Sequence, residues 1–224
     1  MMPDNSVAVV PAAGVGERLG LGPKAFLDLG DRTLIEHVVE TLSACVPRVI
    51  VAVPESQLGM ARDLLGTATT VIAGAETRQA TVARLFQATT ETLVVIHDVT
   101  RPFASAALVR SVLAAATEYG AAAAMMHPPI PVGVVRDGKI QASYDRTQVM
   151  FPQSPQAFRR PLLQQALDHA ARSGIERQTT WQLLQSMGTE IAVVPGEEWN
   201  IKITTHQDWE IARRAIWPVV RAKE

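Results

Sequence analysis

The chain has 224 residues, of which 47% are hydrophobic, and a formal net charge of -1 at pH 7. This size allows one substantial core plus a small excursion, and the near-neutral charge argues against general attraction to nucleic acid. The single Cys45 excludes an intramolecular disulfide and a cysteine-rich zinc site. The sequence shows neither a signal-peptide pattern nor a run of about eighteen apolar residues, so we expect a cytoplasmic protein that binds neither membranes nor nucleic acid.

The N-terminal segment runs from a valine-rich strand into a glycine-rich turn, VAVVPAAGVGERLGLGPKAF. Its glycines would let backbone amides approach a phosphate closely, and Arg18 and Lys24 add positive charge. The glycine spacing does not match the dinucleotide fingerprint, and Ala25 stands where a Walker loop needs Ser or Thr. We therefore predict a nucleoside triphosphate site. The alternative is a plain strand-to-helix turn with solvated charges.

Strand and helix patterns alternate along most of the chain. Strands are expected at 7–10, 49–53, 70–72, 93–96, 121–126 and 191–194, and helices at 34–43, 56–65, 78–88, 105–119, 160–173, 179–187 and 205–220. This alternation predicts an α/β fold in which helices cover both faces of a mainly parallel sheet. Ligands bind such sheets beyond the carboxyl ends of the strands, where the loops at 11–26, 74–81 and 97–102 should converge.

Residues 128–155 interrupt this alternation. Prolines, an Asp137-Gly138 turn and short apolar runs at 132–135 and 140–143 predict an antiparallel hairpin. A hairpin of this size does not fold alone. We expect a β-arm over 128–155 that packs against a second subunit, within a single domain over 1–224.

An acidic residue, Asp98, directly follows the predicted strand at 93–96. A carboxylate at this position beside a triphosphate loop suits magnesium, which prefers carboxylate and phosphate oxygens. The alternative roles of Asp98 are a helix N-cap and an ion pair with Arg101. His97 has no second His or Cys at metal-ligand spacing, so we assign it a structural hydrogen bond.

Lys202 lies in a short extended segment, NIKIT, before a helix that Thr204 or Thr205 would cap. Asn200, Lys202 and Thr204 alternate along this segment, so their side chains are predicted to face one side and meet phosphate. An exposed edge strand with a solvated lysine is the alternative.

Four segments, PAAGVGERLGLGPKAF, HDVTRPF, PQSPQAF and NIKIT, cover nearly the whole chain in this order and resemble the 2-C-methyl-D-erythritol 4-phosphate cytidylyltransferase family. The resemblance implies a Rossmann-like α/β nucleotidyltransferase domain whose projecting β-arm interlocks in a homodimer. It also implies transfer of CMP from CTP to 2-C-methyl-D-erythritol 4-phosphate, a step of isoprenoid precursor synthesis, with release of pyrophosphate. The implied cofactor is Mg²⁺ or another divalent cation.

The resemblance also implies roles for particular residues. The catalytic cations would be Arg18, Lys24, Arg146 and Lys202, with Arg146 reaching the other subunit's site from the arm. The nucleotide would be bound by Pro11, Ala12, Ala13, Gly14, Gly16, Ala75, Glu76 and Thr81. The acceptor would be bound by Asp98, Arg101, Arg146, Ser154 and Thr204, with Asp98 also near the metal.

The chain departs from the family pattern on the acceptor side. An Asp-Thr pair usual in the arm is replaced by the apolar run at 131–134, and a Thr-Asp-Asp or Thr-Asp-Glu run is replaced by Gln-Thr-Thr-Trp at 178–181. These losses leave other acceptors open, such as ribitol or glycerol phosphate. A guanylyl- or uridylyltransferase and a non-catalytic nucleotide-binding paralogue are further alternatives, the last disfavoured by the retained cations.

Overall fold

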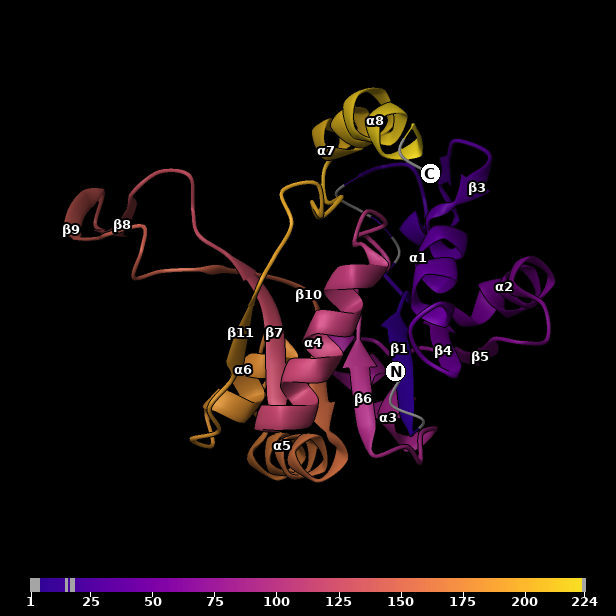
Figure 1. Ribbon diagram of the computed structural model, residues 1–224, viewed down its shortest axis with the longest axis horizontal. Coiled ribbons are helices and arrows are strands. Elements are labelled where there is room, and N and C mark those ends of the chain that lie inside the picture. Colours follow the sequence, from indigo (N-terminus) through magenta and orange to yellow (C-terminus); the bar gives the residue numbers. More distant parts are fainter. Residues whose placement is uncertain (1–4, 15, 17–18, 223–224) are drawn as a thin grey trace.

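The computed structural model describes residues 5–14, 16 and 19–222, and within them seven strands form one central sheet in the order β11-β7-β10-β6-β1-β4-β5 (Figure 1). The strands are β1 (Ser6–Pro11), β4 (Arg48–Val53), β5 (Thr70–Ala73), β6 (Leu93–Ile96), β7 (Ala121–Met126), β10 (Phe151–Arg159) and β11 (Ala192–Pro195). Neighbouring strands are parallel except at β10, which runs antiparallel to both β6 and β7. The predicted mainly parallel sheet is confirmed.

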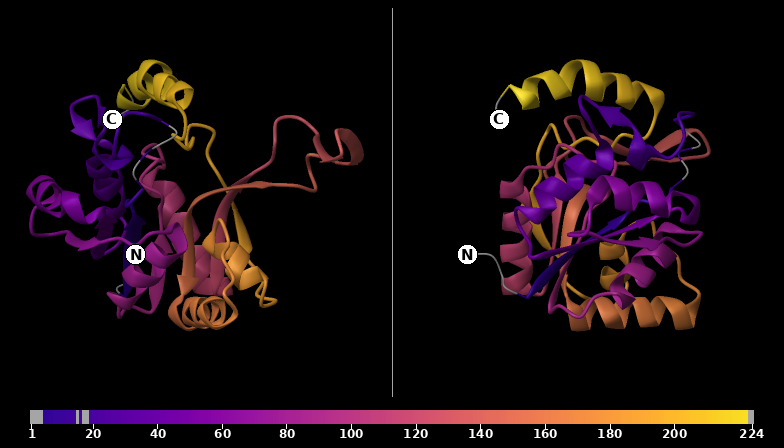
Figure 2. Two further views of the ribbon diagram at one scale, coloured as in Figure 1. Left: turned by 180° about the vertical axis from the view of Figure 1, so that it is seen from behind. Right: turned by 90° about the vertical axis from the view of Figure 1, so that its right-hand side faces the viewer.

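Side chains of each strand alternate between two apolar layers. In β1, Val7 and Val9 pack on one face of the sheet, and Ala8 and Val10 pack on the other. A strand that is buried on both faces therefore reads as a continuous apolar run. The first face is covered by α3 (Arg78–Gln87), α5 (Arg160–Ser173) and α6 (Thr180–Gln185). The second is covered by α1 (Leu34–Ser43), α2 (Leu58–Leu65) and α4 (Ala106–Tyr119), which gives the three layers seen in Figure 2.

The helices begin at polar caps that the sequence supplies. The side chains of Thr77 and Ser105 accept hydrogen bonds from backbone amides in the first turns of α3 and α4, and Thr33 forms a capping box with Glu36 at the start of α1. Short 3-10 helices occur at Lys24–Phe26 and Glu55–Gln57. The predicted helix at 205–220 is divided into α7 (His206–Ile211), a π-helical turn (Ala212–Ile216) and α8 (Trp217–Arg221).

A third apolar cluster joins the C-terminal helices to the chain that follows the glycine-rich turn. Trp209 and Ile216 pack with Leu19, Leu29 and Phe103 in this cluster. A short hairpin of β2 (Asp28–Leu29) and β3 (Arg32–Thr33), which the sequence did not predict, lies between the turn and α1. The C-terminal helices therefore cover the top of the sheet, above the carboxyl ends of the strands (Figure 1).

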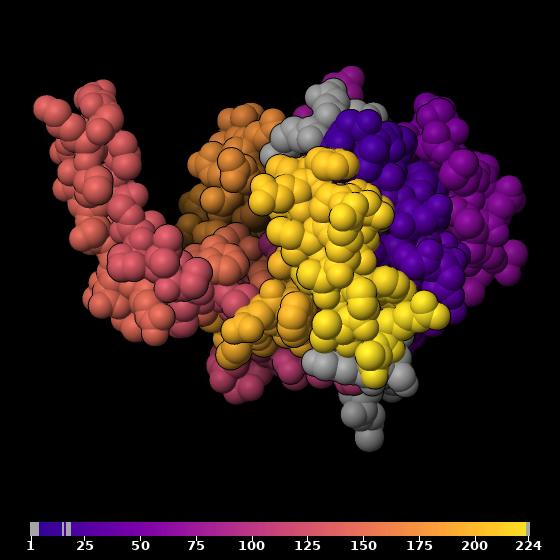
Figure 3. Space-filling view, turned by 90° about the horizontal axis from the view of Figure 1, so that it is seen from above, coloured from indigo at the N-terminus to yellow at the C-terminus, as the bar shows by residue number. Residues whose placement is uncertain are grey.

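The predicted hairpin is present as β8 (Val132–Arg136) and β9 (Lys139–Tyr144). Its tip is the Asp137-Gly138 pair, with φ of 51° and 72°, as a two-residue hairpin turn requires. Both strands are exposed along their whole length, and Figure 3 shows the arm projecting away from the body. Exposed apolar side chains, among them Ile140 and Val135, lie on it.

The arm ends earlier than predicted. Residues 151–155 belong to β10, where Phe151 and Pro152 pair with β7 and Gln153 and Ser154 are buried. Strand β10 was missed because Pro152 and Pro155 disfavour a central strand. The strand accommodates these prolines where its register against β7 shifts, between Pro152 and Gln156. Among the described residues, none of the helices is both long and apolar enough to cross a membrane.

Candidate nucleotide-binding site

A cleft of about 1000 Å³ lies where the loops after β1, β5 and β6 meet. Every residue predicted to bind the nucleotide lines it, namely Pro11, Ala12, Ala13, Gly14, Gly16, Ala75, Glu76 and Thr81. Lys24, Asp98 and Lys202 line it as well. The predicted convergence of loops is therefore present. A separate hollow of about 780 Å³ beside β11 is lined by described residues that include no lysine or arginine, so it does not suit a triphosphate.

Two glycines allow the cleft to be built from closely packed backbone. Gly16 has a φ of +78°, and a Cβ there would overlap the carbonyl oxygen of Gly22. A Cβ on Gly74 would overlap the side chain of Ala13, so the loop after β5 lies directly against the loop after β1. Thr81 fixes that second loop, because its Oγ1 accepts from Ala75 N at 3.0 Å and donates to Ala75 O at 3.2 Å.

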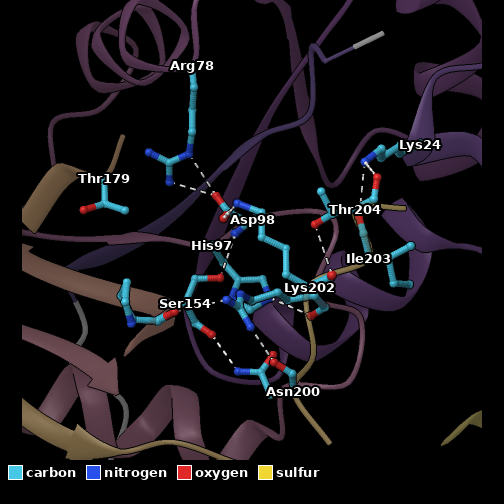
Figure 4. A network of polar contacts seen from close by, with 12 residues as sticks. Lys24, Arg78, His97, Asp98, Ser154, Thr179, Asn200, Lys202, Ile203 and Thr204 are labelled. Atoms are coloured by element: carbon cyan, nitrogen blue, oxygen red, sulfur yellow. Dashed lines mark hydrogen bonds and ion pairs between the residues drawn. The ribbon is translucent and has the colours of Figure 1, made fainter. Parts of the chain in front are cut away.

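Asp98 lies between two cations at the floor of the cleft (Figure 4). Arg78 donates from Nε and Nη2 to Asp98 Oδ1 at 3.0 and 2.8 Å, and Lys202 Nζ donates to Oδ2 at 2.8 Å. Burial raises the pKa of the Asp98 carboxyl, but the charges and hydrogen bonds of Arg78 and Lys202 outweigh burial and hold that pKa well below its usual range. Asp98 is therefore ionised at neutral pH and holds two cations from distant segments at one place.

Sequence reasoning missed Arg78. It is the first residue of α3 and lines the cleft. Its guanidinium forms one of the two ion pairs of Asp98. A single arginine at the start of a helix matches no sequence motif. The one indication that it could reach the site was its position in the 74–81 loop, which was predicted to lie there.

Lys24 connects the glycine-rich turn to the segment that carries Lys202. Its Nζ donates to the backbone oxygens of Thr204 at 2.8 Å and of Ile203 at 3.3 Å. Lys24 and Lys202 are both predicted phosphate ligands. Lys24 therefore bonds the backbone of the two residues that directly follow Lys202 (Figure 4). The predicted ligand Arg18 lies outside the described residues.

His97 is buried behind Asp98 with one ring nitrogen engaged. Its Nε2 lies 3.0 Å from Arg101 O, which fixes the tautomer that donates from Nε2. Burial lowers the pKa of the imidazole to about 4. His97 is thus a neutral structural donor at physiological pH, and the Asp98 ion pairs are with Arg78 and Lys202 rather than with Arg101.

Three of the predicted acceptor ligands do not line the cleft. The Arg101 guanidinium is buried and donates to the backbone oxygens of Asn200 at 2.5 Å and Pro152 at 3.1 Å. Ser154 is buried, and its Oγ accepts from Asp98 N at 3.0 Å. Thr204 contributes its backbone oxygen to Lys24, and its hydroxyl donates to Lys202 O at 3.2 Å. These residues support the site from behind.

Arg146 lies in the exposed arm and not in the cleft lining of the same chain, so its reach to the other subunit's site stays a prediction. Its backbone oxygen accepts from His127. One further prediction differs from the structure. The expected common face of Asn200, Lys202 and Thr204 is wrong, since Asn200 is fully buried whereas Lys202 is exposed. The cause is a tight turn in which Asn200 N and Ile201 N donate to the oxygens of Glu197 and Trp199, so the segment is not a strand.

An α/β sheet with a glycine-lined, cation-bearing cleft at the carboxyl ends of its strands defines a nucleotide-binding protein of the Rossmann-like class. A sequence model of the 2-C-methyl-D-erythritol 4-phosphate cytidylyltransferase family matches residues 6–217. The chain belongs to this family of CTP-dependent enzymes of isoprenoid precursor synthesis.

Curated relatives and solved structures agree with this assignment. The 2-C-methyl-D-erythritol 4-phosphate cytidylyltransferase of Thermus thermophilus is 39% identical over 91% of this chain and 93% of its own. The enzyme of the same name from Deinococcus radiodurans is 38% identical over 92% of this chain and 88% of its own length. The Thermus thermophilus crystal structure covers 96% of this chain and 98% of its own at a TM-score of 0.81 with 36% identity. A 4-diphosphocytidyl-2C-methyl-D-erythritol synthase from Anaerococcus prevotii covers 93% and 96% at a TM-score of 0.83 with 25% identity.

His97 makes the stability of the protein depend on pH. Because a histidine in the unfolded chain titrates near about 6.5, the unfolded chain binds more protons between that pH and about 4. The free energy of unfolding should therefore fall by roughly 2 to 3 kcal/mol from His97 between about pH 7 and pH 4.5. In His97→Gln this contribution should vanish, as measured by urea unfolding at both pH values, whereas the exposed His206→Gln should keep it. Equal pH slopes in wild type and His97→Gln would contradict the assignment.

Proposed function

We propose that the cleft binds CTP and a polyol phosphate and transfers CMP from the first to the second with release of pyrophosphate. One observation carries this proposal, namely that Lys24, Arg78, Asp98 and Lys202 gather in one cleft beside the glycine-rich turn. The family's own substrate, 2-C-methyl-D-erythritol 4-phosphate, is the acceptor that the comparisons favour.

The chemistry needs charge more than it needs a base. A phosphate monoester has its second pKa near about 6, so the attacking oxygen is already anionic at neutral pH. The barrier comes from bringing two anions together and from charge that develops on the α-phosphoryl group and the leaving pyrophosphate. Fixed cations address both costs, since they are oriented before the reaction begins.

The positions of the cations suggest a division of roles. Lys24, together with Arg18 in the glycine-rich turn, would bind the triphosphate and stabilise the charge that the leaving pyrophosphate acquires. Lys202 would face the α-phosphoryl group from the opposite wall, with Arg78 beside it. Asp98 holds the last two in place through one ion pair with each.

A divalent cation would enter this cleft on the phosphates of the nucleotide and not at a preformed protein site. Among the described residues, no three of His, Cys, Asp and Glu cluster as a metal site. Both oxygens of Asp98 already accept from Arg78 and Lys202. Mg²⁺ usually takes one or two carboxylates plus substrate phosphates, so Asp98 would hold it only by giving up a cationic partner. The ion would supply further charge neutralisation on the phosphates.

The arm supports a homodimer. Its strands β8 and β9 contact little of their own chain, and their exposed apolar side chains include Ile140 at 75% and Val135 at 63%. Apolar surface of this kind is stabilised when another surface covers it. A second copy that packs on the arm could also receive Arg146 at its own cleft, which would place this cation on the acceptor phosphate.

We retain a cytoplasmic location as part of the proposal, supported by the one free thiol, Cys45, which is buried.

Replacing Lys24 by alanine should lower kcat for pyrophosphate release by about 10²- to 10³-fold, because one fixed donor to the transition state is lost. The assay would use CTP and 2-C-methyl-D-erythritol 4-phosphate, with the other three nucleoside triphosphates and with ribitol and glycerol phosphates as competing substrates. Arg213→Ala removes a surface cation paired with Glu210 and should leave kcat unchanged. A Lys24→Ala enzyme with wild-type kcat would contradict the role of Lys24.

Ile140→Asp should convert the dimer to monomers in analytical ultracentrifugation, because it places a charge in an interface that we propose to be apolar. Leu64→Asp makes the same change at a 39% exposed position on α2, away from the arm, and should leave the mass unchanged. A monomeric wild type, or a dimeric Ile140→Asp, would rule out dimerisation through the arm.

A further inference from the structure

A buried polar cluster lies behind Lys202 and Asp98, and Asn200 is at its centre. Asn200 is fully buried and does not line the cleft. Its Nδ2 donates to Gln153 Oε1 at 3.0 Å and to Ser154 O at 2.8 Å, both in β10. Buried hydrogen bonds of this kind are costly to lose, because the groups left behind have no water to replace them.

The first consequence concerns the segment that carries Lys202. Within the described chain this segment belongs to no strand, and both backbone and side-chain hydrogen bonds hold it against the sheet. Ile203 N, next to Lys202, donates to Thr100 O at 2.8 Å. Gln153 donates to Glu197 O at 2.9 Å and accepts from Glu197 N at 3.1 Å, while Asn200 O accepts from Arg101 at 2.5 Å. With Asn200 bonded to Gln153 as well, the turn at 197–200 is fixed on β10 just before Lys202.

The second consequence concerns Asp98. The carbonyl oxygen of Ser154 accepts from Asn200, and the hydroxyl oxygen of the same serine accepts from Asp98 N at 3.0 Å. Asn200 is therefore bonded to the residue that positions the Asp98 backbone, and it lies two residues before Lys202. One side chain thus connects the supports of both ends of the 2.8 Å ion pair between Lys202 and Asp98 (Figure 4).

The position uses the two N–H donors of the asparagine, while its Oδ1 is buried without a hydrogen-bond partner among the described residues. Both groups that face Asn200 Nδ2 are acceptors, so the site needs two N–H donors on one short side chain. Aspartate has the same shape but would bring a buried negative oxygen against two oxygens, and alanine would leave both acceptors without this donor.

We infer that Asn200 is a positioning residue for catalysis, which acts on the reacting phosphoryl group only through Lys202 and Asp98. This inference rests on the proposed function. Since misplacement of a reacting group by about 1 Å can cost about a hundredfold in rate, Asn200→Ala should lower kcat by about 10- to 100-fold. Affinity for CTP, measured by calorimetry, should change by less than about threefold, because Asn200→Ala removes no group from the cleft lining and most of the nucleotide-binding residues belong to the loops after β1 and β5.

A matched control separates positioning from stability. Thr89 is buried at the opposite, amino end of the strands, where its Oγ1 donates to Phe86 O and accepts from Arg160 Nη1, each at 2.6 Å. Thr89→Val keeps the shape and removes two buried hydrogen bonds. It should lower the melting temperature as Asn200→Ala does but keep the wild-type kcat.

The decisive test is a double-mutant cycle with Lys202→Met. If Asn200 acts through Lys202 and its ion pair, the double variant should have the same kcat as Lys202→Met alone. A further loss of about 10-fold in the double variant, or a wild-type kcat in Asn200→Ala, would overturn the inference. If Asn200→Ala does not fold, Gln153→Met takes its place, because it removes the side-chain oxygen to which Asn200 donates, and an unchanged kcat there would overturn the inference. A wild-type enzyme that releases no pyrophosphate with any acceptor would instead overturn the proposed function.

Discussion

The site depends on one carboxylate, Asp98, which remains ionised while it is almost enclosed by protein. An isolated buried charge is expensive, and Asp98 is stable there because Arg78 and Lys202 each donate to one of its oxygens. The same bonds bring the start of α3 and the 196–205 segment to the end of β6. The two cations would otherwise repel each other, so the anion between them is what allows a concentration of positive charge in one cleft.

The rest of the fold supplies the conditions for this arrangement. Parallel strands bring the loops after β1, β5 and β6 to one edge of the sheet, and β10, although antiparallel, provides Ser154 and Gln153 as buried supports. The C-terminal helices pack on the chain next to the glycine-rich turn. Lys24 then links that turn to the backbone beside Lys202. Cations that lie far apart in sequence are thus held by backbone contacts and a buried polar cluster.

Much of this was predictable from the sequence, for reasons that can be stated physically. Valine-rich runs buried on both faces revealed most of the strands, and Asp137-Gly138 predicted the hairpin turn because glycine and aspartate tolerate positive φ. The glycine-rich turn and the acid after β6 indicated the cleft. The features that the sequence did not reveal depend on tertiary contacts. Pro152 and Pro155 concealed β10, and a tight turn buries Asn200 instead of placing it on the face of Lys202. The bonds of Arg101 to two backbone oxygens could not be predicted either.

The central claim is that the negative charge of Asp98, and not merely its shape, organises the cations for transfer. Asp98→Asn keeps the shape of the side chain and removes its charge. The direct test is to measure two quantities for the Asp98→Asn enzyme, namely kcat with CTP and 2-C-methyl-D-erythritol 4-phosphate, and the affinity for CTP. We expect kcat to fall by about a hundredfold or more while CTP still binds. A turnover within about twofold of wild type would contradict it.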